Sequence, residues 1–119
     1  MNIGPNVLAP PRELIASMEL HYPGFFRKLA VALDAALEGV DVTVVNWFRT
    51  AEHNAAVGGQ VNSQHRWACA FDLVVPLAQR AQAKTRLQAA GFWVLDEGDH
   101  LHAQAFPAGA LAKSGVRPG

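Results

Sequence analysis

An acidic residue inside an apolar run is the feature that most constrains this chain. The segment 68–75 runs Ala-Cys-Ala-Phe-Asp-Leu-Val-Val and is typical of a strand that is buried on both faces. Asp72 lies within it, and an unpaired carboxylate is costly to bury. A metal ion would offset this cost, as would hydrogen bonds from the backbone or from Arg66. The fold must therefore supply a partner for Asp72.

Histidines before and after Asp72 are candidates for the metal site. His65 precedes Asp72 by seven residues, and His100 and His102 alternate on a later segment. On a strand, His100 and His102 point to the same face and lie about 7 Å apart. A histidine, an aspartate and a second histidine can supply three zinc ligands and leave a fourth position for water. The alternative for His100 and His102 is a solvent-facing position on the strand.

Composition excludes several classes of protein. Ten basic and ten acidic residues give a formal net charge of zero, so we expect no nucleic-acid partner. No apolar stretch approaches the roughly 20 residues needed to span a bilayer, so we expect no membrane insertion. The first twenty residues lack a signal-peptide pattern, which predicts synthesis in the cytoplasm without export by a leader. Cys69 is the only cysteine, and strand alternation turns it away from Asp72, so we interpret it as a core residue.

The apolar patterning predicts an α+β fold with a small central antiparallel sheet and helices packed on it. A single domain with one core is expected over residues 1–119, with an extended, proline-containing arm at 1–12 and a loosely ordered tail at 106–119. Helical spacing and helix-ending glycines predict helices at 11–22, 23–38 and 76–90, with a short helix after Thr50. Strands are predicted at 40–48, 68–75, 92–95 and 100–105.

Arg49 stands where the first of these strands gives way to a turn. From that position a planar guanidinium can bind a carboxylate or a polarised carbonyl. A surface salt bridge is the alternative, and the sequence leaves both open.

Several motifs together resemble the LAS-type zinc peptidases of bacterial cell-wall metabolism. That family includes D-alanyl-D-alanine carboxypeptidases and phage endopeptidases that cut the L-alanyl-D-glutamate bond, and it shares the Hedgehog/DD-peptidase fold. Its pattern Ser-x-His-x-x-Gly-x-Ala-x-Asp is matched here at Ser63, His65, Ala70 and Asp72. An acidic residue three positions before a zinc-binding histidine is matched in Asp99-His100-Leu101-His102, and residues 49–59 resemble the segment that precedes the first motif.

The resemblance implies a role for each residue. His65, Asp72 and His102 would bind one Zn²⁺ ion, Asp99 would be the catalytic base, Arg49 would bind or polarise the substrate carbonyl, and His100 would support the site. A second register stays open, because Glu97 precedes His100 by three residues as Asp99 precedes His102. We prefer Asp99, since strand geometry directs a residue beside the turn toward the site, whereas Glu97 can swing away from it.

Ala68 replaces the glycine of the motif. The added methyl group is tolerable if this residue has ordinary strand dihedral angles, but it is disruptive if the position needs a positive φ.

The resemblance predicts a zinc peptidase that acts on peptidoglycan stem peptides. The expected setting is a phage lysis enzyme or a virion-associated enzyme that acts at the bacterial cell wall, with the N-terminal arm as a possible contact to a virion partner. The alternative is a metal-binding structural or assembly protein that retains the fold without turnover. A hydrolase of another amide is a third, weaker possibility.

Overall fold

The computed structural model describes all of residues 1–119 and has an α+β architecture built on one five-stranded sheet. The strand order is β1-β2-β3-β5-β4, and all neighbouring strands are antiparallel except β1, which runs parallel to β2. The predicted fold class is therefore confirmed, with a mixed sheet in place of a purely antiparallel one. The strands are β1 (Asn2–Ile3), β2 (Thr43–Asn46), β3 (Ala70–Val74), β4 (Trp93–Asp96) and β5 (Leu101–Gln104).

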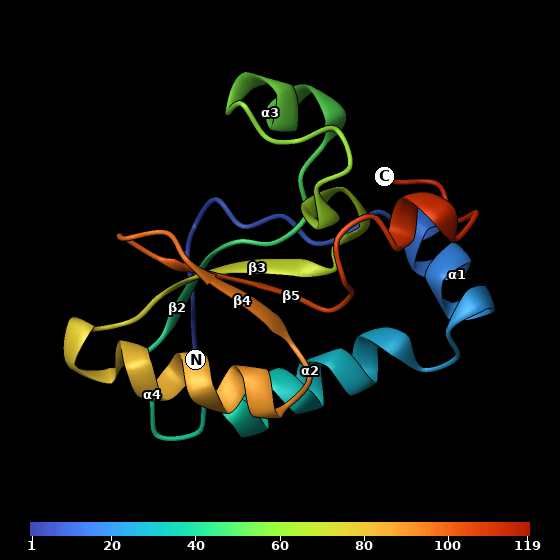
Figure 1. Ribbon diagram of the computed structural model, residues 1–119. Helices are drawn as coiled ribbons and strands as arrows, with labels where there is room; N and C mark the ends of the chain where they lie inside the picture. Colours follow the sequence, from blue (N-terminus) through green and yellow to red (C-terminus); the bar gives the residue numbers. More distant parts are fainter.

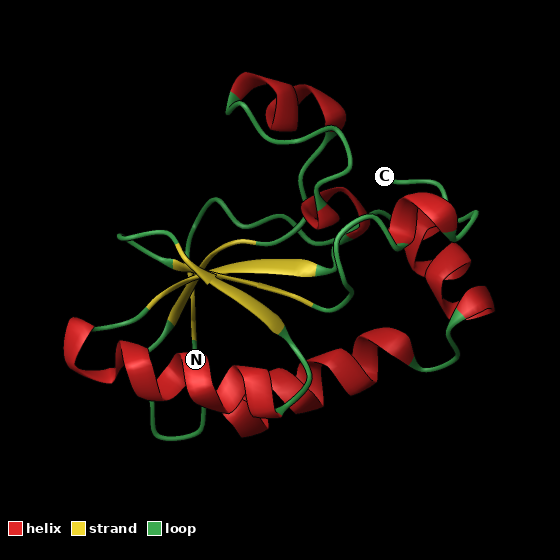
Figure 2. Ribbon diagram, viewed as in Figure 1, coloured by secondary structure: helices red, strands yellow, loops and turns green.

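Two long helices cover one face of the sheet, and the other face is bordered by a short helix and loops (Figures 1 and 2). The covering helices, α2 and α4, agree with the predicted ranges to within two residues at each end. None of the helices combines the length and the apolar composition that a membrane span requires. The helices are α1 (Arg12–His21), α2 (Phe25–Ala36), α3 (Ala51–Ala56) and α4 (Leu77–Ala89), with short 3-10 helices η1 (Gln64–Trp67) and η2 (Leu111–Lys113).

The main core lies between the sheet and α2 and α4. Leu29 and Leu33 are spaced by one helical turn on α2, as are Ala83 and Leu87 on α4, so each helix buries one stripe. Alternate residues of the strands face this layer, among them Leu73, which is fully buried. Because one face of each strand is used for packing, the residues between them are free to form a site on the other face.

A second hydrophobic cluster lies beyond the end of the sheet, where the sequence predicted only one core. It brings Leu14 and Met18 of α1 against Trp67 of η1 and Leu111 of η2. The chain turns between α1 and α2 at Gly24, whose φ is +72°, so α1 is directed away from the sheet (Figure 1). Partly buried residues such as Phe25 and Trp47 contact both clusters.

Both ends of the chain are attached to the fold. Residues 2–3 of the expected arm pair with β2, and Leu8 bridges Phe48. In the tail, for which composition predicts loose order, the Trp67 Nε1 donates to the Val116 carbonyl at 2.7 Å and Val116 is buried. Because a buried indole N–H needs an acceptor, the hydrogen bond from Trp67 holds Val116 and the tail against the second cluster.

Candidate metal centre

The first pair of site residues comes from two neighbouring strands. Asp72 on β3 lies directly opposite His102 on β5 in the antiparallel register. Phe71 and Leu73, on either side of Asp72, face the main core, so alternation turns Asp72 to the opposite face of the sheet. Asp72 and His102 therefore lie side by side, on the face that α2 and α4 leave uncovered.

His65 reaches the same point from η1. The Ser63 hydroxyl accepts a hydrogen bond from the His65 backbone N–H at 3.3 Å and caps this 3-10 turn. The Arg49 backbone N–H donates to the His65 carbonyl at 2.9 Å, which ties the turn to the segment after β2. The motif serine thus has a local structural role in positioning the histidine.

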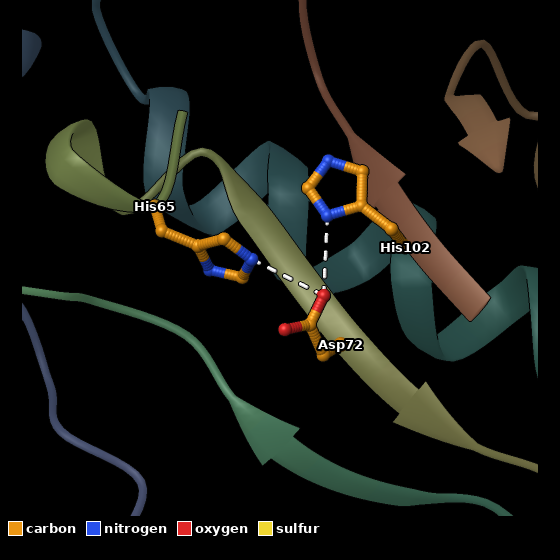
Figure 3. A group of neighbouring side chains, drawn as sticks. All are labelled: His65, Asp72 and His102. Atoms are coloured by element: carbon orange, nitrogen blue, oxygen red, sulfur yellow. Dashed lines mark hydrogen bonds and ion pairs between the residues drawn. The ribbon is translucent and has the colours of Figure 1, made fainter. Parts of the chain in front are cut away.

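Both imidazoles converge on one carboxylate oxygen, Asp72 Oδ1 (Figure 3). His65 Nε2 lies 3.2 Å from it and His102 Nδ1 lies 3.1 Å from it. One ligand atom from each of the three residues lies within 4.8 Å of the others. His65 and Asp72 are buried and His102 is half-buried, so the cluster is open on the side of His102. The structure thus brings together all three of the ligands suggested by the sequence.

The second nitrogen of each ring fixes which nitrogen faces the carboxylate. His65 Nδ1 lies 2.6 Å from the Trp47 carbonyl, which can only accept, so Nδ1 carries the hydrogen. His102 Nε2 lies 2.9 Å from Gln104 Oε1, while the Gln104 amide nitrogen donates to the Phe106 carbonyl at 3.0 Å. In the neutral rings, His65 Nε2 and His102 Nδ1 are therefore the nitrogens without hydrogen.

Two lone pairs that face one carboxylate oxygen repel it unless protons or a metal cation lie between them. Without a metal, a proton on His102 fills this role. Burial raises the pKa of Asp72, but hydrogen bonds from His102 and His65 and their charges outweigh it, so the pKa is well below its ordinary value. Burial lowers the pKa of His102, but hydrogen bonds to Asp72 and Gln104 outweigh it, so this pKa is raised. Two imidazole nitrogens and a carboxylate oxygen are the donor types that zinc accepts, so the cluster could hold this ion.

The other oxygen of Asp72 is held by two side chains. Arg49 Nη2 donates to Asp72 Oδ2 at 3.1 Å, and Asn46 Nδ2 donates to it at 3.3 Å. Arg49, and not Arg66 as suggested from the sequence, is therefore the arginine that donates to Asp72. Because Oδ2 is occupied, Oδ1 alone is directed to the histidines.

Arg49 is anchored on its other side by Asn54 of α3, which is in turn bound to the loop that follows this helix. Arg49 Nη1 donates to Asn54 Oδ1 at 3.4 Å, and Asn54 Nδ2 donates to the Gln60 carbonyl at 2.8 Å. A Cβ atom at Gly59 would overlap Asn54 Oδ1, so glycine is needed there for close approach. Arg49 thus forms a partly buried ion pair with Asp72 and no exposed salt bridge, and its contact with substrate stays a prediction.

Two glutamines that the sequence analysis missed join the histidine-bearing segments. Gln64 Nε2 donates to the Phe106 carbonyl at 2.6 Å, and Gln64 Oε1 accepts from the Phe106 N–H at 3.1 Å. Gln104 donates to the same carbonyl. Gln64 precedes His65, and Gln104 holds His102, so the Phe106 backbone links both ligands. The only signal in the sequence was proximity, because Gln64 directly precedes His65 and Gln104 lies two residues after His102.

Asp99 lies outside the cluster. Its side chain is 88% exposed, and its Oδ1 accepts from His100 Nδ1 at 2.6 Å. This hydrogen bond and the charge of His100 lower the pKa of Asp99. His100 Nε2 lies 3.7 Å from Asp72 Oδ1 and 3.8 Å from Glu97 Oε2, so His100 stands between both acidic candidates and the three ligands.

Cys69 and Ala68 lie beside the cluster in the sequence but do not belong to it. Cys69 is buried and outside the three-residue group, and burial raises the pKa of its thiol, as expected for a core residue. Ala68 has a φ of +58° and a ψ of +29°, which is the left-handed region. The disruptive case considered for the motif glycine thus applies, and β3 begins only at Ala70.

Comparison with known proteins supports the same interpretation as the geometry. A family model described as Peptidase M15 matches residues 12–104, which include every candidate site residue. No curated protein matches the chain.

Proposed function

This chain belongs to the Peptidase M15 family, whose members are zinc peptidases, and from that premise we propose that it hydrolyses peptide bonds in peptidoglycan stem peptides. The observation that carries the proposal is the convergence of His65 Nε2 and His102 Nδ1 on Asp72 Oδ1, with the second nitrogen of each ring already occupied. Family membership supports a metallopeptidase with a peptide substrate. The peptidoglycan substrate rests on the resemblance of the motifs to cell-wall peptidases.

His65, Asp72 and His102 would hold one Zn²⁺ ion. When bound, zinc lowers the pKa of a coordinated water towards about 7 and polarises a peptide carbonyl. The chain's own contribution is to present the two imidazoles in fixed tautomers and to keep Asp72 ionised. His102 and His65 do the latter, because their hydrogen bonds and charges lower the pKa of Asp72, while Arg49 holds Oδ2 in an ion pair and its remaining N–H groups would orient the substrate carbonyl.

Asp99 would take the proton of the attacking water and return it to the leaving amine. Its carboxylate is charged at neutral pH, as an aspartate with an ordinary pKa would be, and the hydrogen bond from His100 lowers the pKa further. His100 would orient Asp99 and face the cluster with Nε2. Glu97 is the competing acid, since its Oε2 approaches the same nitrogen.

Purified peptidoglycan and mass analysis of the released fragments test the proposal. The zinc-loaded protein should release peptide fragments, and removal of zinc by a chelator should stop the release. A lost terminal alanine indicates a carboxypeptidase, whereas an opened alanyl-glutamate link indicates an endopeptidase. Asp99→Asn should lower the rate by about 100-fold or more, while Glu97→Gln should not. The reverse result would assign the proton transfer to Glu97.

A metal-binding structural or assembly protein is the second candidate, favoured by the high exposure of Asp99 and its attachment to His100. Stoichiometric zinc without any cleavage of peptidoglycan, unchanged by Asp99→Asn, would support this function over catalysis.

The proposed place of action follows from the substrate. Peptidoglycan lies outside the cytoplasm, so a protein made inside must reach the wall, as a phage lysis enzyme or a virion component does. The phage setting rests on resemblance to phage endopeptidases. A contact of the N-terminal arm with a virion partner would have to use residues that β1 leaves exposed.

A further inference from the structure

Two large apolar side chains are exposed on the last strand of the sheet. β4 is an edge strand, with β5 on one side and no strand on the other. Trp93 is 50% exposed and Leu95 is 61% exposed, whereas Val94 between them is packed in the main core. Alternation therefore places Trp93 and Leu95 on the face opposite α2 and α4, which is the face of the metal centre.

The strand register places these side chains next to the candidate ligands. Trp93 lies opposite Gln104, and Leu95 lies opposite His102. The Glu97 N–H donates to the His100 carbonyl at 2.9 Å, so Glu97 continues the same row one step beyond β4. Cross-strand neighbours on one face are in contact range. The row formed by Trp93, Leu95 and Glu97 thus runs beside Gln104, His102 and His100.

A hollow of about 500 Å³ lies along this edge. It is lined by Trp93 and Leu95 together with Gln104, and Gln88 and Ala108 border it. Gln104, which lines the hollow, also lies 2.9 Å from His102 Nε2, so the hollow adjoins a residue that contacts a candidate ligand. A peptide whose scissile bond lies at the cluster would have neighbouring residues over this row.

Glu97 supplies a negative charge at one end of the row. Its side chain is 46% exposed and approaches only His100, at 3.8 Å. The acidic residues on either side are engaged elsewhere, because Asp96 faces Arg80 at 3.7 Å and Asp99 binds His100. Neither lysine nor arginine pairs with Glu97, so its carboxylate can accept a cation from a ligand.

We propose that Trp93, Leu95 and Glu97 form a substrate subsite for a residue that has an aliphatic stem and a terminal ammonium group. This inference rests on the proposed peptidase function and specifies the substrate class for that site. The stem would lie on Leu95 beside His102, and the ammonium would meet Glu97 about 7 Å further along the strand, a span similar to a lysine side chain. Trp93 would pack against the adjoining substrate residue.

A matched pair of synthetic stem-type pentapeptides tests the subsite, with lysine or norleucine at the same position. These side chains share their four-carbon length, and only lysine carries a charge. The zinc-loaded protein should cleave the lysine peptide with a kcat/KM about tenfold higher, the value of a charge-assisted contact at a partly exposed site. Glu97→Gln should bring the two peptides within about twofold of each other. Leu95→Ser should lower kcat/KM for both peptides.

Binding to the metal-free protein gives a readout that is independent of turnover. Trp93 is the exposed tryptophan, whereas Trp67 is buried and Trp47 is half-buried, so peptide binding should change its fluorescence. The lysine peptide should bind more tightly, and Trp93→Phe should remove most of the signal. Leu20→Ala and Glu38→Gln, at exposed positions on α1 and after α2, are controls that should change neither measurement.

The outcomes separate the subsite from the catalytic proposal. Equal cleavage of both peptides by the wild-type protein, or a lysine preference that survives Glu97→Gln, overturns the subsite and leaves the peptidase intact. Loss of all cleavage in Glu97→Gln also overturns it, because Glu97 would then act in proton transfer. Selective binding of the lysine peptide without cleavage supports the subsite and contradicts the peptidase.

Discussion

The left-handed backbone at Ala68 makes a measurable prediction about stability. A non-glycine residue in this region carries a strain of about 1–2 kcal/mol. Ala68→Gly relieves the strain but removes a fully buried methyl group, worth about 0.8 kcal/mol. Glycine also loses about 0.5–1 kcal/mol more in backbone entropy on folding. These contributions nearly cancel, so the change in the free energy of unfolding should be within about 1 kcal/mol of zero.

Ala70→Gly is the matched control for this substitution. Ala70 is equally buried and only two residues away, but it lies in β3 and has no positive φ. Ala70→Gly removes a methyl group and adds the backbone entropy cost of glycine, with no strain to relieve. This variant should therefore be destabilised by about 1.5 kcal/mol. The two variants should differ by about 1–2 kcal/mol, which corresponds to several degrees in Tm for a chain of this size.

Urea unfolding of the metal-free variants measures both free energies without a contribution from zinc binding. The slope with urea should be the same for both variants, because each substitution removes one methyl group. If Ala68→Gly is destabilised as much as Ala70→Gly, the backbone at position 68 carries no strain, and the reasoning fails.

Three further predictions concern the metal centre. Gln104→Leu should weaken zinc binding by about 10–100-fold, because His102 Nε2 loses its acceptor. Gln104→Glu keeps an acceptor and should weaken zinc binding less. Competition with a chelator measures both affinities, and equal values would contradict this prediction. Zinc affinity should rise as pH rises through the raised pKa of His102, because its ring stays protonated below that pKa and a protonated ring cannot bind zinc. In the metal-free protein the same group should stabilise the fold fully below about 6.5, and this contribution should be lost as pH rises through the raised pKa. Asp72→Asn should destabilise the metal-free protein by about 3–5 kcal/mol, because Arg49 is left without its partner; unfolding at wild-type urea concentrations would show that the ion pair is not needed.

The sequence predicted the parts of this protein that depend on local pattern. Helices α2 and α4 follow from apolar stripes with helical spacing, and the grouping of His65, Asp72 and His102 follows from a motif whose spacing is matched. Their roles as zinc ligands stay predictions until an ion is measured. These features could be predicted because period and spacing are properties of short segments.

The contacts that hold the site together could not be predicted in the same way. Gln64 pairs with the backbone of Phe106, 42 residues later, and nothing in either segment indicates the other. The resemblance implies a substrate-binding role for Arg49, which stays a prediction, but the sequence does not indicate its ion pair with Asp72, 23 residues away. A two-residue strand such as β1 is too short to give a periodic pattern. Each of these contacts forms between segments that are far apart in the sequence, so it depends on tertiary packing and not on the local pattern of residues.

The attachment of the C-terminal segment has a consequence for anyone who alters that end of the polypeptide. The Gly119 N–H donates to the Arg66 carbonyl at 2.8 Å, and Trp67 donates to the Val116 carbonyl, so both bonds fasten residues that directly follow His65. Removal of residues 116–119 would release both bonds together and loosen the turn that positions the imidazole of His65. A tag or fusion joined directly after Gly119 would therefore disturb the candidate metal centre, and placing it at a different position would be the safer choice for enzymology.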